Sequence, residues 1–229
     1  MYQRSTWPDA AELYRAQRDT IAGVIGAFDG DPDGVAVPAC PAWTVAELTA
    51  HLAGTPAALL ERSYPGDDAV SWVAGHVAAR RGRSATDNLA EWDEVGPGYD
   101  RLLGKNEEAW GSLLYDAIAH EHDLREALDL PGGRDGAAID YAVDRALAQV
   151  DAKATAAGAG VLRITAGERS WEVGTGEATA TLSAPTPWEL MRLLGSRRSE
   201  RQVRAAITGD ADLWLAVLPW GTPDRDSTG

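Results

Sequence analysis

The chain has 229 residues, enough for one large domain or two small ones, and 45% of them are apolar, an ordinary globular proportion. Acidic residues outnumber basic ones by 35 to 21, and the net charge of −14 argues against nucleic acid and anionic membranes as partners. No apolar run is long enough to span a membrane, and the polar N-terminus lacks the apolar core of a signal peptide, so we expect a cytoplasmic protein.

The first half of the chain predicts helices. The first is expected from about Asp9 to Phe28, where apolar residues recur at the spacing of one buried face. Thr44-Val-Ala-Glu47 forms a capping box and predicts the start of a second helix. Further helices are expected over 69–80, from about 86 with an interruption at Gly96-Pro97-Gly98, over 106–128 and over 137–156.

After about residue 158 the pattern changes to short β-branched segments separated by glycines. Strands are expected over 161–165, 170–173, 178–182 and 203–207, with helices over 187–194 and 212–217. The chain is therefore predicted to be α+β, with a helical domain over residues 1–158 and a small α+β domain over residues 159–229.

The long helix expected over 106–128 carries the residues that best fit a metal site. Asp116 and His120 are four residues apart and share one helical face beside its apolar line, a common half-site for a divalent cation. His51 lies beside the apolar face of the second helix and can supply a third ligand. Three ligands with an open fourth position indicate a catalytic site. The alternative is a buried hydrogen bond between Asp116 and His120 without a metal.

Other candidate groups carry weaker signals. His122 points away from His120 and is expected at the surface, and His76 is expected on a helix face without a special role. Asp123 is expected either to orient an imidazole that binds the metal or to form a cap or salt bridge. Cys40, the only cysteine, excludes an internal disulfide and a cysteine-based zinc cluster. Because no histidine or basic residue is near it in sequence, we expect a packing role rather than a nucleophile.

Three segments resemble a known family. Pro38 to Leu52 is similar to the first signature of mycothiol-dependent maleylpyruvate isomerases, a Cys-Pro-x-Trp-Thr turn followed by a helix ending in His-Leu. Asp116 to Leu130 is similar to the second signature, and Leu193 to Gln202 is similar to a Gly-Arg-Arg-Ser-x-x-Gln element of the C-terminal domain. The resemblance implies a DinB-like four-helix bundle followed by a sterol-carrier-like α+β domain.

The same resemblance implies a function. Zinc or another divalent metal would be bound by His51, Asp116 and His120, with mycothiol as the thiol cofactor or co-substrate. Arg197 or Arg198 would serve catalysis by holding a substrate carboxylate. The expected activity is that of an isomerase or thiol S-transferase acting on a small electrophile. The characterised isomerases carry Glu at the position of Asp116, so the acidic ligand of this chain has a shorter side chain.

Two other functions remain open. The same three ligands could serve a hydrolase in which the metal activates water, and thiol dependence of the activity would separate the two enzymes. A non-catalytic binding or stress-response protein is the second alternative, which weak or absent metal binding would favour.

Overall fold

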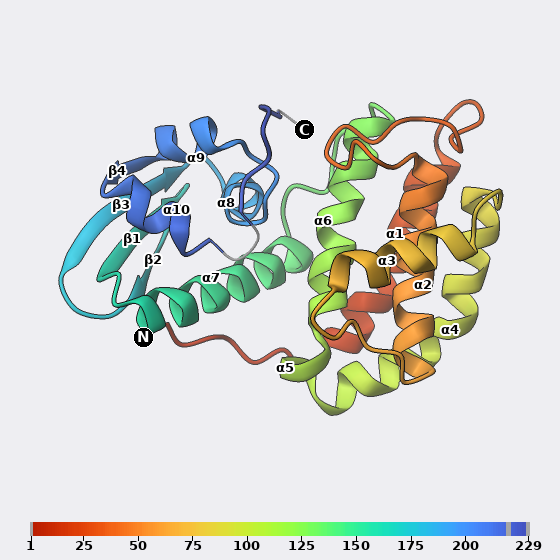
Figure 1. Cartoon of the computed structure of the whole chain (residues 1–229), viewed down its shortest axis with the longest axis horizontal. Helices are drawn as coiled ribbons and strands as arrows, with labels where there is room; N and C mark the ends of the chain where they lie inside the picture. The colour runs from red at the N-terminus through yellow and green to blue at the C-terminus, as the bar shows by residue number, and fades with distance from the viewer. Residues whose placement is uncertain (1, 219–220, 228–229) are drawn as a thin grey trace. The chain divides into compact units, whose positions relative to one another are not determined.

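The computed structural model describes residues 2–218 and 221–227, and it has two compact units. The helical unit comprises residues 7–132, and the α/β unit comprises residues 133–227 together with residues 2–6 (Figure 1). The α+β class predicted from the sequence is confirmed. Among the described residues, no helix is both long and apolar enough to cross a membrane.

Four long helices form the core of the helical unit. α1 and α2 each pack against both α4 and α6, while the shorter α3 lies across α2 and the short α5 precedes α6 (Figure 1). Their bounds are α1 Ala10–Gly26, α2 Val45–Leu60, α3 Ala69–Ala79, α4 Ala85–Lys105, α5 Glu107–Trp110 and α6 Ser112–Ala127. The start predicted for α2 is confirmed, because Thr44 and Glu47 form a capping box in which each side chain accepts from the other's backbone N–H.

The predicted interruption at Gly96-Pro97-Gly98 is wrong, because α4 continues through it. The two glycines let neighbouring side chains approach the helix closely. A Cβ on Gly96 would lie 2.5 Å from Cζ of Arg18, and one on Gly98 would lie 2.8 Å from a methyl of Leu60. These glycines therefore allow neighbouring side chains to pack closely on α4. The segment was interpreted as a turn because the sequence alone does not show which side chains approach it.

The helix predicted over 106–128 is two helices in the structure. Asn106 ends α4 and caps α5 by accepting a hydrogen bond from the backbone N–H of Ala109. Gly111 then separates α5 from α6. The helix that carries Asp116 and His120 consequently starts at Ser112, and the predicted spacing of the two residues on it is retained.

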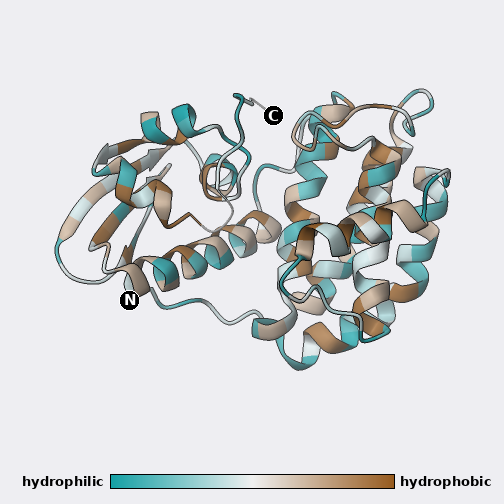
Figure 2. Cartoon of the chain, in the orientation of Figure 1, coloured by the Kyte–Doolittle hydropathy of each residue, from teal (hydrophilic) through white to brown (hydrophobic). Residues whose placement is uncertain are grey.

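The α/β unit begins earlier than the predicted boundary at residue 158. Its first helix, α7 (Ala137–Ala157), packs on strand β2 and helix α8 of the same unit. Figure 2 shows brown and teal bands alternating along α7, and its buried residues include Ile139, Leu147 and Val150. The boundary in the structure, between residues 132 and 133, therefore differs from the predicted one because this amphipathic helix needs the sheet to cover its apolar face.

A mixed four-stranded sheet in the order β2-β1-β3-β4 forms the rest of the unit with three short helices. β1 pairs antiparallel with β2 and parallel with β3, and β3 pairs antiparallel with β4. The bounds are β1 Val161–Ala166, β2 Arg169–Gly174, β3 Ala178–Ala184, α8 Pro187–Leu194, α9 Glu200–Ala206, β4 Ile207–Gly209 and α10 Ala211–Ala216. Alternate residues of β1 and β3 are buried, as a sheet with one covered face requires.

One predicted strand is largely helix. Residues 203–206 belong to α9, which Ser199 and Gln202 open with a capping box, and only Ile207 begins β4. Val203 is β-branched, but it is buried on the inner face of a helix. A local capping signal therefore outweighed strand propensity here.

Candidate metal centre

The three predicted metal ligands come together inside the helical unit. His51 projects from α2, and Asp116 and His120 project from successive turns of α6. The imidazoles of His51 and His120 are buried, whereas the side chain of Asp116 is 34% exposed. The Asp116 side chain is therefore partly exposed, while its two neighbours are held in the protein interior.

The geometry gives each oxygen of the Asp116 carboxylate its own imidazole. Nε2 of His51 lies 2.8 Å from one oxygen, and Nε2 of His120 lies 3.4 Å from the other. The three ligand atoms all lie within 4.8 Å of one another. Two imidazole nitrogens and one carboxylate oxygen are ligands that zinc accepts, so the donor set fits a divalent cation with a free coordination position.

Hydrogen bonds at the opposite ring nitrogens orient both imidazoles. The Thr55 hydroxyl donates to the carbonyl oxygen of His51 at 3.0 Å, so it is left to accept from Nδ1 of the same histidine at 3.2 Å. The buried Asp123 carboxylate accepts from Nδ1 of His120 at 2.9 Å. Both Nε2 atoms are thereby directed at Asp116, which is the orientation that a metal-binding histidine takes from such partners. This fits one of the two roles expected for Asp123.

The charges of the cluster shift the pKa values of two members. Burial alone would raise the pKa of Asp116, but its interactions with the imidazoles of His120 and His51 lower it far below its usual range. Burial alone would lower the pKa of His120, but the Asp116 carboxylate and the hydrogen bond that the imidazole donates to Asp123 raise it well above 6.5.

Two further residues lie next to the centre: Trp43, for which no role was predicted, and Cys40, for which a packing role was predicted. The indole of Trp43 stacks on the His51 ring at 5.1 Å between centroids, and Sγ of Cys40 lies 3.9 Å from the Asp123 carboxylate. Both belong to the turn before α2, which is closed by a hydrogen bond from the N–H of Val37 to the carbonyl of Trp43. The signal that could have found them is this turn's position, immediately before the helix that carries His51.

The remaining predicted residues are not members of the His51–Asp116–His120 cluster. Arg197 and Arg198 belong to the α/β unit, and Arg198 makes a bidentate ion pair with Glu189 at 2.7 Å for both contacts. Their catalytic role stays a prediction. His122 is buried, so its predicted surface position is wrong, because α6 is buried on all sides from residue 117 to residue 124.

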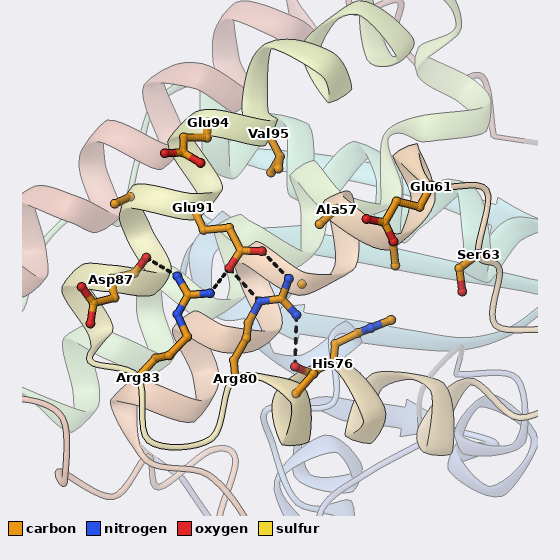
Figure 3. A pocket seen from close by; sticks show the side chains of 14 residues that line it. Ala57, Glu61, Ser63, His76, Arg80, Arg83, Asp87, Glu91, Glu94 and Val95 are labelled. Carbon is orange, nitrogen blue, oxygen red and sulfur yellow. Dashed lines mark hydrogen bonds and ion pairs between the residues drawn. The ribbon is translucent and has the colours of Figure 1, made fainter.

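A separate cavity of about 850 Å³ lies among α2, α3 and α4, and the three candidate ligands do not line it (Figure 3). The guanidinium groups of Arg80 and Arg83 converge on the carboxylate of Glu91 from α4, and Arg80 also donates to the carbonyl of His76 at 3.1 Å. Burial alone would raise the pKa of Glu91, but the two arginines lower it. These contacts tie the end of α3 to α4, so we interpret them as structural.

Comparisons with known proteins do not identify the chain. No protein-family model matches it, and searches of curated proteins and of solved structures give no match. The resemblance described above therefore depends on the residues quoted for it.

Proposed function

We propose that the chain is a cytoplasmic, zinc-dependent enzyme that uses a low-molecular-weight thiol, mycothiol, in an isomerase or S-transferase reaction on a small electrophile. In this proposal the helical unit is a DinB-like four-helix bundle and the α/β unit is sterol-carrier-like. The packing of α1 and α2 on α4 and α6 is compatible with such a bundle. The resemblance of the Pro38–Leu52 and Asp116–Leu130 segments supports the thiol.

One observation carries the proposal. Two buried imidazoles point their Nε2 atoms at the two oxygens of the Asp116 carboxylate, whose side chain is partly exposed. A purely structural hydrogen bond would need only one imidazole per carboxylate and no opening. Three protein ligands with one accessible side are the arrangement in which a catalytic metal keeps a position for a substrate group.

The chemistry follows from the donor set. A divalent metal bound there would favour the thiolate form of a coordinated thiol at neutral pH, and the thiolate is the nucleophile. His51 and His120 would bind the metal through Nε2 while Thr55 and Asp123 hold their rings in place. Asp116 would supply the one negative charge of the ligand set. The Trp43 indole, stacked on His51, would help to shield that imidazole from water.

A substrate carboxylate would need a cation, and Arg197 or Arg198 is our candidate for it. Arg198 is buried and its Nε and Nη2 both donate to Glu189, so a substrate would have to compete with that carboxylate. Arg197 donates from Nη1 to the carbonyl of Gly195 at 3.0 Å. The arginine part of the proposal can thus fail without affecting the metal part.

The metal content of the purified full-length protein tests the first step. After zinc is supplied and excess removed, we expect about one zinc per chain in the wild type and none in Asp116→Ala. His76→Ala is the matched control, because it removes a histidine of the same unit outside the cluster and should retain the zinc. A wild-type protein that retains no zinc would contradict the proposal. It would favour the alternative of a non-catalytic binding protein.

Thiol dependence tests the second step. The zinc-loaded protein should convert small electrophiles such as cis-configured enone acids or epoxides only when mycothiol is present, and Asp116→Ala should lose that activity. Zinc-dependent turnover of esters or amides without any thiol would instead identify a hydrolase.

A further inference from the structure

Cys40, His120 and Asp123 form a second group of ligand atoms beside the proposed centre. Sγ of Cys40, a ring nitrogen of His120 and a carboxylate oxygen of Asp123 lie within 4.8 Å of one another, and Nδ1 is the ring nitrogen that contacts Asp123, at 2.9 Å. The carboxylate is fully buried and His120 is nearly so, whereas Cys40 is half-buried. This group uses the opposite ring nitrogen of His120 from the one that faces Asp116.

From this geometry we propose that Cys40, Asp123 and Nδ1 of His120 form a second binding site for a thiophilic divalent cation. Thiolate, imidazole and carboxylate are all zinc ligands, and a thiolate favours soft ions such as Cd²⁺ over hard ones. The half-buried sulfur supplies a path for the ion to enter, while the two buried partners supply ligands already close together.

The existing contacts show what binding would require. Nδ1 of His120 and Sγ of Cys40 both approach the same oxygen of Asp123, at 2.9 and 3.9 Å. A cation that replaces these two hydrogen bonds forms bonds to sulfur, nitrogen and oxygen and displaces the thiol proton and the Nδ1 proton, which pass to solvent. No oxidation or reduction occurs.

The two sites share a residue, so they are linked. Neutral His120 offers a lone pair on one ring nitrogen at a time, and a cation on Nδ1 leaves a proton on Nε2, facing Asp116. Occupation of the Cys40 site therefore removes His120 from the His51–Asp116–His120 set. A soft cation would displace zinc by capturing the shared histidine instead of by entering the zinc position.

Cadmium absorption tests the proposal without any activity measurement. The chain has a single cysteine, so a thiolate-to-cadmium charge-transfer band in the ultraviolet can arise only from Cys40. We expect the band to saturate at one Cd²⁺ per chain in the metal-free wild type and to be absent in Cys40→Ser. No band in the wild type would overturn the proposal.

The partner residues are tested separately. Asp123→Asn should weaken the cadmium affinity about 10–100-fold, and an unchanged affinity would mean that Cys40 binds alone. Because Asp123 is fully buried, far-ultraviolet circular dichroism must first show that the variant folds. If it does not fold, cadmium NMR of the wild type decides, since its shift separates a sulfur–nitrogen–oxygen ligand set from a sulfur-only one.

Asp116→Ala separates this site from the proposed function. That change removes a ligand of the first centre but leaves Cys40, Asp123 and Nδ1 of His120 in place, so the cadmium band should persist with similar affinity. Loss of zinc together with retention of the band is the expected result. A band that disappears with Asp116 would show that the two groups are one site.

Discussion

Two charged clusters of the helical unit differ in one instructive respect. Arg18 and Asp100 form a closed pair, each about 6% exposed and joined by two parallel hydrogen bonds of 2.8 and 3.0 Å. The His51–Asp116–His120 cluster instead directs two imidazoles at one carboxylate that is 34% exposed. In the first cluster the guanidinium of Arg18 and the carboxylate of Asp100 bind each other through two hydrogen bonds and are shielded from solvent, as expected of a structural element. In the second cluster, two ring nitrogens converge on the carboxylate of a partly exposed side chain, an arrangement that suits a bound metal ion.

The largest effect is expected from breaking the closed pair. Arg18→Met leaves the buried carboxylate of Asp100 with only the exposed Arg15, whose Nε lies 3.6 Å away. We expect a loss of about 3–5 kcal/mol in the free energy of unfolding, measured by urea denaturation, with the zinc content of the folded protein unchanged. Arg15→Met removes the exposed partner of the same carboxylate and should cost less than about 1 kcal/mol. Equal losses for both variants would show that the pair is not closed.

A smaller effect is expected from a substitution at Gly96, which the guanidinium of Arg18 approaches closely. Gly96→Ala would place a methyl group 2.5 Å from Cζ of Arg18, so the guanidinium must move away from Asp100. We expect a destabilisation of about 1–3 kcal/mol by thermal or urea unfolding. Gly104→Ala is the control on the same helix, because its Cβ would meet only a methyl at 3.6 Å and should raise helix stability by up to about 1 kcal/mol. A neutral Gly96→Ala would contradict the close-approach explanation of that glycine.

The smallest expected effect is a dependence of stability on pH, and it comes from the His51–Asp116–His120 cluster. The folded pKa of His120 is raised above 6.5 by Asp116, so the stability that this interaction contributes is present below pH 6.5 and is lost as pH rises through the folded value. The Asp116 contribution is present above 3.8 and is lost only as pH falls through its lowered folded pKa. The melting temperature of the metal-free protein should therefore decrease as pH rises from 6.5, and it should decrease less in Asp116→Asn. An identical slope in the variant would contradict the charge coupling.

Local signals were sufficient for most elements of the fold. The capping box at Thr44, the apolar spacing of α1 and the alternation in β1 and β3 each depend on residues within a few positions of one another. The candidate site was also partly local, because the four-residue spacing of Asp116 and His120 on one helix places them on the same face wherever that helix packs. Element types and the α6 half of the centre were therefore predictable.

Other features depended on contacts between segments far apart in the chain. The glycines of α4 were taken for a break because the side chains that approach them, Arg18 at Gly96 and Leu60 at Gly98, are far away along the chain. Cys40 was assigned to packing because no histidine is near it in sequence, yet the fold brings it beside Asp123, which holds His120. His122 was assigned to the surface because helical geometry places it opposite His120. That geometry does not show which other segments cover this side of the helix, and His122 is buried.

The sequence by itself determined the α+β class, the positions of most helices and strands and the Asp116–His120 half-site, since hydrophobic period, capping and i, i+4 spacing act over short distances. Only the tertiary structure decided how closely His51 approaches Asp116, that the Asp116 side chain alone of the three is partly exposed, and that Thr55 and Asp123 orient the rings. Those properties arise from how α2 and α6 pack. The side chains that pack them are distributed along the whole unit, so no single segment of sequence contains the information.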